Sequence, residues 1–149
     1  MKEPLIEGIS MTDKARIAVM VSGTGTNLQA LIDAQKSGLI EKLGSEKIKG
    51  ISHITGGGFY ENIPRSIPGG LSARISRKAI RVLPIFDLIA KVGVISDHDM
   101  FNTFNMGVGM TVIVSREDAP AALNVLRENG EDAYVIGVIA RGSEKITIE

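Results

Sequence analysis

The sequence predicts an α/β fold, a layered α/β sandwich in which helices cover a mixed sheet. Apolar runs of strand length are interleaved with segments whose apolar residues recur at helical spacing along the chain. No internal repeat is visible. Neighbouring helices expected near residues 85–103 argue against the strict strand-helix alternation of a Rossmann fold.

The first expected element is a strand over Arg16–Val21, an unbroken apolar run of the kind found in strands covered on both faces. A turn over Ser22–Thr26 follows, and helical spacing begins at Asn27. Strand, glycine loop and helix in this order form a βα unit, which normally belongs to a parallel or mixed sheet.

Helix signals are clearest in the middle of the chain. Pro84 suits the first turn of a helix that Gly93 would close, and Ser96 suits an N-cap followed by Asp97 and Asp99, two acids favoured by the helix dipole. The remaining expected elements are strands over 48–55, 71–76, 107–114, 133–140 and 145–148, a short helix ending at 64, and helices over 84–92, 97–104 and 117–129.

The composition limits the classes of function. The 149 residues suffice for one ordinary core, and 17 basic residues balance 17 acidic ones, so the basic surplus of a nucleic-acid binder is missing. The chain contains no cysteine, which excludes disulfides, thiolate catalysis and sulfur-ligated metals. Without an apolar run of about 20 residues no membrane partner is expected. These features predict a cytoplasmic protein with no metal site of its own.

A glycine triplet, Gly56-Gly57-Gly58, interrupts the segment from His53 to Arg65. Glycines allow positive φ and a close approach of the backbone, so the triplet is typical of a bend whose N–H groups bind an anion. The structural alternative is a tight strand-to-helix turn, which rarely needs three glycines.

Polar residues surround the triplet and make it a candidate ligand site. His53 is a tentative catalytic residue because imidazole titrates near neutrality, although a histidine at a strand end is more often structural. Thr55, Asn62 and Arg65 are candidate substrate or phosphate ligands, the guanidinium of Arg65 being a fixed cationic fork. The alternative for Arg65 is an i, i+4 ion pair with Glu61.

A second candidate phosphate loop follows the first expected strand and consists of Ser22, Gly23, Thr24, Gly25, Thr26 and Asn27. Small residues and hydroxyls before a helix suit a phosphate. The loop lacks the lysine of a Walker motif and the third glycine of a dinucleotide fingerprint, so its local sequence is a weak signal.

Two other segments have simpler interpretations. Asp97-His98-Asp99 resembles a metal cluster, but consecutive helical residues point in different directions, so a solvated helix start is the better interpretation. The glycines of Phe104–Met110 alternate with apolar residues, which favours a buried strand that packs in the core, with Asn105 a weaker candidate for ligand contact.

Four ordered segments resemble the carboxy-terminal domain of aminoimidazole ribonucleotide synthetase, also called phosphoribosylformylglycinamidine cyclo-ligase. The resemblance covers about residues 48–149 and includes His53–Arg65, Leu83–Phe86, Asp99–Gly107 and Gly130–Gly137. It implies the mixed-sheet α/β sandwich of that domain and a role in purine biosynthesis.

The same resemblance implies a substrate. It would be formylglycinamidine ribonucleotide. The group bound at the glycine bend would be the ribose phosphate of this substrate or, alternatively, the phosphates of ATP. In this family phosphate from ATP activates the formyl oxygen, and a substrate nitrogen attacks to close the imidazole. The ATP and magnesium ligands belong to an amino-terminal half without counterpart here, so the cofactors ATP and Mg²⁺ are implied by resemblance only, and an ATP-binding partner domain is expected.

Residues 11–38 resemble a different family, glycinamide ribonucleotide formyltransferase, through the run from Arg16 to Leu31. This divides the chain into a poorly ordered leader over 1–14, a formyltransferase-like strand-loop-helix unit and seam over 15–43, and a synthetase-like domain over 44–149. The seam itself would lie between about Lys36 and Leu43.

Three functions remain open. The first is an incomplete cyclo-ligase domain, inactive without its ATP-binding half. The second is a non-catalytic, chimeric phosphate-binding scaffold, and a remote third is a formyltransferase fragment. Surface left uncovered by a missing half also predicts a homo-oligomer.

Overall fold

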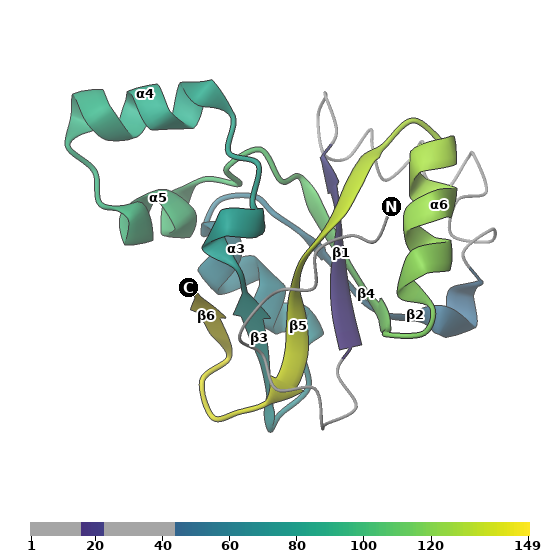
Figure 1. Ribbon diagram of the computed structural model, residues 1–149. Helices are drawn as coiled ribbons and strands as arrows, with labels where there is room; N and C mark the ends of the chain where they lie inside the picture. Colours follow the sequence, from purple (N-terminus) through teal and green to yellow (C-terminus); the bar gives the residue numbers. More distant parts are fainter. Residues whose placement is uncertain (1–15, 23–43) are drawn as a thin grey trace.

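The computed structural model describes residues 16–22 and 44–149, which form a six-stranded sheet with helices on both faces (Figure 1). The strand order is β2-β4-β1-β5-β3-β6. The strands are β1 (Arg16–Ser22), β2 (Ile48–His53), β3 (Leu71–Ile75), β4 (Met110–Ser115), β5 (Asp132–Arg141) and β6 (Ile146–Ile148). The helices are α3 (Gly58–Asn62), α4 (Pro84–Gly93), α5 (Asp97–Thr103) and α6 (Ala119–Glu128), with 3-10 turns η1 (Ser45–Lys47), η2 (Ile63–Ser66) and η3 (Arg77–Ala79).

The sheet is mixed, as predicted. β3 and β6 run parallel, whereas the other described strand neighbours run antiparallel. β1 forms where the apolar run predicts it and lies between β4 and β5, antiparallel to both. The turn was expected over Ser22–Thr26, but Ser22 is the last residue of β1, and the rest of that turn and the helix expected after it lie outside the described residues.

Two apolar cores lie on opposite faces of the sheet because side chains alternate along β4. Val112 and Val114 pack toward α6, where Leu123 and Leu126 are buried. Ile113 belongs to the larger core on the other face. The helical side of that core comes mainly from α3, η2 and α5, and its most buried members include Phe59, Ile63, Met100 and Phe101.

The segment before β4 differs from the sequence-based expectation of a strand from residue 107. β4 begins only at Met110, and Met106 and Gly107 have φ angles of 53° and 97°. A Cβ atom at Gly107 would lie 2.8 Å from Leu83 Cγ, so contact with a distant segment accompanies the turn. The core role is nevertheless confirmed, because Met106 and Val108 are buried.

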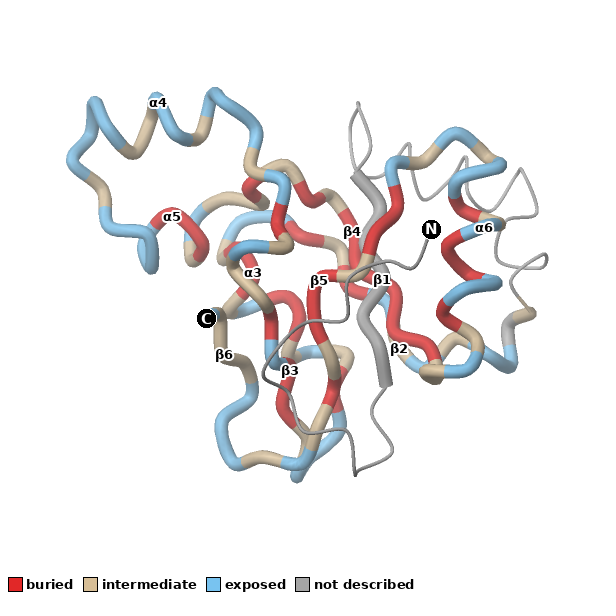
Figure 2. The backbone as a smooth tube through the Cα atoms, in the orientation of Figure 1, coloured by how far each residue is buried: buried red, intermediate tan, exposed pale blue. Residues whose placement is uncertain are grey.

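α4 also departs from expectation at its end. Gly93 is its last helical residue, and the left-handed position belongs to Val94, with φ 52° and ψ 42°. No residue of α4 is fully buried (Figure 2). Its apolar side chains Ile85, Leu88 and Val92 are between 53% and 75% exposed.

The other boundaries differ from expectation by a few residues at most. β2 ends at His53, two residues early, and α5 ends at Thr103. Ser96 caps α5 as predicted, its hydroxyl oxygen accepting a hydrogen bond from the Asp99 N–H. Within the described parts of the chain, no helix has both the length and the apolar character that crossing a membrane requires.

Candidate functional site

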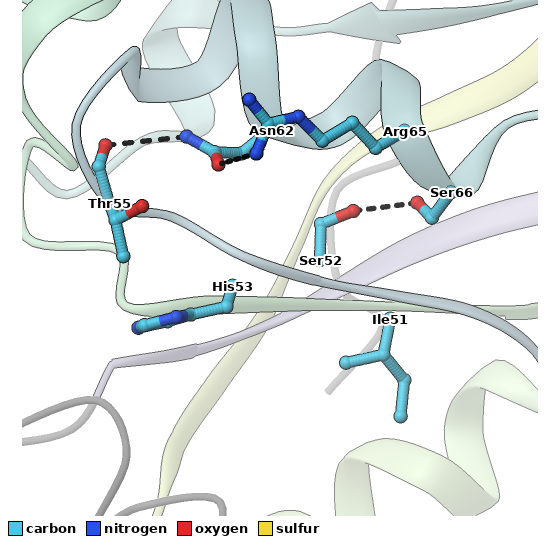
Figure 3. A pocket seen from close by; sticks show the side chains of 7 residues that line it. All are labelled: Ile51, Ser52, His53, Thr55, Asn62, Arg65 and Ser66. Carbon is cyan, nitrogen blue, oxygen red and sulfur yellow. Dashed lines mark hydrogen bonds between the residues drawn. The ribbon is translucent and has the colours of Figure 1, made fainter.

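The candidate site lies along β2, an edge strand of the sheet. Ser52 points toward η2, where its hydroxyl oxygen is 2.6 Å from that of Ser66. Ile51 and His53 point to the opposite side of the strand (Figure 3), as the two-residue period of a strand requires. η2 lies close because Gly50 has no side chain; a Cβ atom there would be 3.0 Å from the Ser66 carbonyl oxygen.

A pocket of about 310 Å³ opens along this edge. It brings together four of the predicted site residues and three that the prediction did not include. The predicted four are His53, Thr55, Asn62 and Arg65, and the added three are Ile51, Ser52 and Ser66. The alternation of side chains in β2 could have identified Ser52, whereas Ser66 depends on how η2 folds back over the strand.

Asn62 fixes the shape of the glycine bend. Its side chain is 4% exposed, and its Nδ2 group donates to the carbonyl oxygens of Thr55, Gly56 and Gly58 at 3.3, 3.2 and 2.7 Å. The Oδ1 atom accepts from the Arg65 guanidinium at 3.4 Å. The amide therefore joins the bend to the arginine, as Figure 3 shows in part.

The three glycines have three different surroundings. Gly56 is open, with no atom within 4 Å of an added Cβ. Gly57 has a φ of 88°, and its missing Cβ leaves room for the Glu61 carboxylate, 2.5 Å from the Cβ position. Gly58 lies against the carbonyl of Phe101, and its N–H donates to Thr55 at 2.9 Å. Among the described residues, no partner is found for the N–H groups of Gly56 and Gly57.

Arg65 supplies the positive charge of the pocket and is already paired. Its guanidinium lies 3.6 Å from the Glu61 carboxylate, at the i, i+4 spacing recognised in the sequence. Both side chains are more than half exposed, so the pair is worth only a few tenths of a kcal/mol. A more strongly charged anion could displace Glu61 at small cost.

His53 lies at the pocket but on the other side of β2 from Arg65 and Asn62 (Figure 3). Its Nε2 atom is shielded from solvent and has no hydrogen-bond partner among the described residues. The side chain is thus separated by the strand from the cationic part of the pocket.

The remaining sequence candidates are dispersed. Ser22 ends β1 in register with Asp132, and the other members of its loop, 23–27, lie outside the described residues. Asp97 accepts two hydrogen bonds from Arg77 Nε and one from its Nη2, whereas the His98 ring lies 4.6 Å from the Tyr60 ring. No group of three potential metal ligands occurs in the portion of the chain that the structure describes.

The comparisons with known proteins identify the fold family. Residues 16–149 match the model of the AIR synthase related protein, C-terminal domain. The chain belongs to this family. The match begins at the first residue of β1, so the central strand is included with the rest of the sheet.

Similar curated proteins are cyclo-ligases. The chain is 49% identical over 110 residues to the phosphoribosylformylglycinamidine cyclo-ligase of Caldicellulosiruptor saccharolyticus, covering 74% of this chain and 31% of that one. It is 43% identical over 132 residues to the enzyme of the same name from Alkaliphilus metalliredigens, covering 86% and 38%. The chain thus spans about a third of the length of these relatives.

Several solved structures share the fold. The HypE-HypF complex matches with a TM-score of 0.64 and 26% identity over 90% of this chain and 49% of that one. PurL of T. maritima complexed with AMPPCP matches with a TM-score of 0.52 and 12% identity over 89% of this chain and 22% of that one, which shows the fold alone.

These matches confirm the synthetase-like resemblance and the fold class. They do not support the formyltransferase-like resemblance of residues 11–38, because the synthetase-related family model already includes β1. Most of that segment lies outside the described residues, and the proposed division at residues 43 and 44 stays a prediction.

Proposed function

We propose that this chain is the substrate-holding part of a phosphoribosylformylglycinamidine cyclo-ligase of purine biosynthesis, and that the pocket along β2 binds the phosphoribosyl end of the substrate. The observation that carries the proposal is the meeting of Thr55, Asn62 and Arg65 in one pocket of about 310 Å³. The curated relatives, at 43% to 49% identity, support the substrate class.

Arg65 is the proposed phosphate ligand because it is the cationic side chain that lines the pocket. The open backbone at Gly56 and the hydroxyl of Thr55 would supply neutral donors beside it. Asn62 would act indirectly, since its Nδ2 group already donates to three carbonyl oxygens of the bend. His53 stays a candidate for contact with the reacting end of the substrate.

ATP and Mg²⁺ would come with a separate ATP-binding domain, either elsewhere in a longer chain or in a cytoplasmic partner. Phosphoryl transfer depends mainly on positioning and on charge stabilisation by magnesium. The described residues offer no cluster of metal ligands for this task. We therefore expect the chain to bind substrate but to release ADP only when that domain is added.

Calorimetric titration of the full chain with formylglycinamidine ribonucleotide and with ribose 5-phosphate tests the binding. Arg65→Ala should weaken both ligands at least tenfold, because hydrogen bonds to charged groups are worth about 1.5 to 3 kcal/mol. Arg74→Ala is the control, since this exposed arginine lies on β3, which neighbours β6 at the opposite edge of the sheet from β2. Equal effects of the two variants, or no binding by the wild type, would contradict the proposal.

Glu61→Gln gives a second test with the opposite sign. The Glu61 carboxylate competes for Arg65 and lies beside Gly57. Removing its charge should strengthen ribose 5-phosphate binding about two- to fivefold. A weaker affinity in this variant would place the phosphate elsewhere.

The non-catalytic scaffold remains the second candidate, and turnover separates the two. If the chain binds the ribonucleotide but an added ATP-binding domain produces no ADP, the scaffold is favoured.

A further inference from the structure

The main chain of β2 offers hydrogen-bonding groups at the pocket. The strand pairs with β4 in the register Ser52↔Thr111 and His53↔Met110, and the Ile54 N–H donates to the Gly109 carbonyl at 2.9 Å. In an antiparallel pair, residues alternately point their N–H and C=O groups toward and away from the partner. The main-chain N–H and C=O groups of Ile54 and Ser52 therefore point toward β4, whereas those of Ile51 and His53 point outward.

This outward edge is unpaired within the described chain. Neither the N–H nor the C=O group of Ile51 or His53 has a hydrogen-bond partner among the described residues. The Ile51 side chain is 37% exposed, and both residues line the pocket beside Arg65. An open strand edge is a template for any extended molecule with peptide-like donors and acceptors.

We propose, building on the function above, that this edge holds the formylglycinamidine part of the substrate as a short added strand. The His53 N–H donates to the formyl oxygen, and the His53 carbonyl accepts from the amidine N–H that carries the ribose. The substrate runs parallel to β2 and directs its phosphoribosyl end toward Thr55, Gly56 and Arg65.

The chemistry of the ligand fits this arrangement. Formylglycinamidine is a glycine residue with a formyl group on its nitrogen and an amidine in place of its carboxyl amide. In its extended form the formyl oxygen and the ribosyl-bearing N–H point to the same side, flanking the glycine. A residue on a parallel strand meets this pair of groups with its own N–H and C=O, which are the two outward groups of His53. In the protonated amidine this nitrogen carries a hydrogen that can be donated.

A parallel direction also agrees with the side chains around the pocket. It places the phosphate beyond the end of β2, where Gly56 leaves open space and Asn62 links the Thr55 carbonyl to Arg65. An antiparallel substrate would direct its phosphate away from the glycine bend and toward the start of β2.

Proline substitution tests the main-chain contact because proline lacks an N–H and is tolerated on the open side of an edge strand. His53→Pro removes the outward donor and the side chain, whereas His53→Ala removes the side chain alone. Relative to His53→Ala, His53→Pro should bind formylglycinamidine ribonucleotide about five- to tenfold more weakly, the value of one hydrogen bond. Ribose 5-phosphate, which lacks the formylglycinamidine part, should bind both variants equally.

Ile51→Pro is the matched control. It removes the other outward N–H of β2, which the parallel arrangement leaves unused, so its affinity for the ribonucleotide should equal that of Ile51→Ala. If Ile51→Pro weakened binding of the ribonucleotide and His53→Pro did not, the proposed contact would be overturned.

Hydrogen exchange followed by NMR tests the same contact without a substitution, in case His53→Pro does not fold. The ribonucleotide should slow exchange of the His53 amide proton, and ribose 5-phosphate should not. If the ribonucleotide binds in an Arg65-dependent way but leaves this amide unprotected, the strand-edge proposal fails while the proposed function stands. If neither ligand binds, the proposed function fails.

Discussion

The backbone of Gly58 lies directly against the carbonyl group of Phe101, so that a Cβ atom at Gly58 would overlap the carbonyl oxygen. This contact joins the start of α3 to α5 and places Phe59 against Phe101, with ring centroids 5.0 Å apart. The third glycine of the triplet therefore serves packing, while Gly56 stays open.

Gly58→Ala should lower the free energy of unfolding by about 3 kcal/mol or more, because the methyl group adds overlap to a positive φ of 55°. Gly56→Ala is the control, since nothing lies within 4 Å of its Cβ position and its φ is not positive. Urea unfolding of both variants measures the difference. Equal stabilities would show that α3 can move away from α5 without cost.

The contrast between these two glycines marks a limit of sequence reasoning. The sequence predicts a bend at the triplet, and it predicts β1 and the N-cap at Ser96, because each depends on local pattern and chain geometry. Which glycine is open depends on where α5 lies, and α5 begins only at Asp97. Local pattern cannot supply that information.

The segment before β4 shows the same limit. Its alternation of glycine with apolar residues predicts a strand, but Met106 and Gly107 adopt positive φ where the chain passes Leu83. Four of the predicted site residues line one pocket, but their arrangement around β2 could not be read from the sequence. His53 is two positions from Ile51 and so shares its side of β2, which separates it from Arg65.

Thr111 gives a prediction about stability. Its side chain is fully buried in β4, and its Oγ1 atom has no hydrogen-bond partner among the described residues. Thr111→Val keeps the shape and removes the unsatisfied hydroxyl, so we expect a gain of about 1 kcal/mol and a Tm higher by about 2 to 4 °C.

Thr111→Ala, which removes both the hydroxyl and the methyl group, distinguishes their effects on stability. It should lose stability, because the cavity left by the missing methyl outweighs the benefit of removing the hydroxyl. A lower Tm for Thr111→Val would mean that the hydroxyl has a partner, such as a buried water.

Val94 carries backbone strain at the end of α4. A β-branched residue in the left-handed region is unfavourable, and Val94 is 91% exposed, so its side chain gains little from packing. Val94→Gly should raise the free energy of unfolding by roughly 0.5 to 1 kcal/mol, the relief of strain being partly offset by the greater freedom of glycine in the unfolded chain.

Val94→Ala is the comparison, because alanine still has a Cβ and should gain less. Thermal unfolding at equal protein concentration measures both variants. A Val94→Gly protein with a reduced Tm would indicate that the exposed valine is covered by another molecule.

Asp99 gives a prediction about pH. The hydroxyl of Ser96 donates to the Asp99 carboxylate at 2.7 Å, and this hydrogen bond is the main reason that the pKa of Asp99 is lowered, with His98 contributing less. The carboxylate is favoured in the folded state, so its contribution to stability is complete above its unfolded pKa of about 3.9 and is lost as the pH falls through the lower folded value. In Ser96→Ala the pKa of Asp99 should rise toward the ordinary value, and this part of the acid-induced loss of stability should disappear.

A second pair of residues supplies the control for this titration. Ser115 donates to Asp118 at 2.6 Å and is the main cause of the lowered pKa of that carboxyl group. Ser115→Ala should therefore raise the pKa of Asp118 and leave Asp99 unchanged, while Ser96→Ala should do the reverse. NMR titration of the side-chain carboxyl carbons measures both groups in each variant. If Asp99 titrates in Ser96→Ala as it does in the wild type, neighbouring charge rather than the cap hydroxyl sets its pKa.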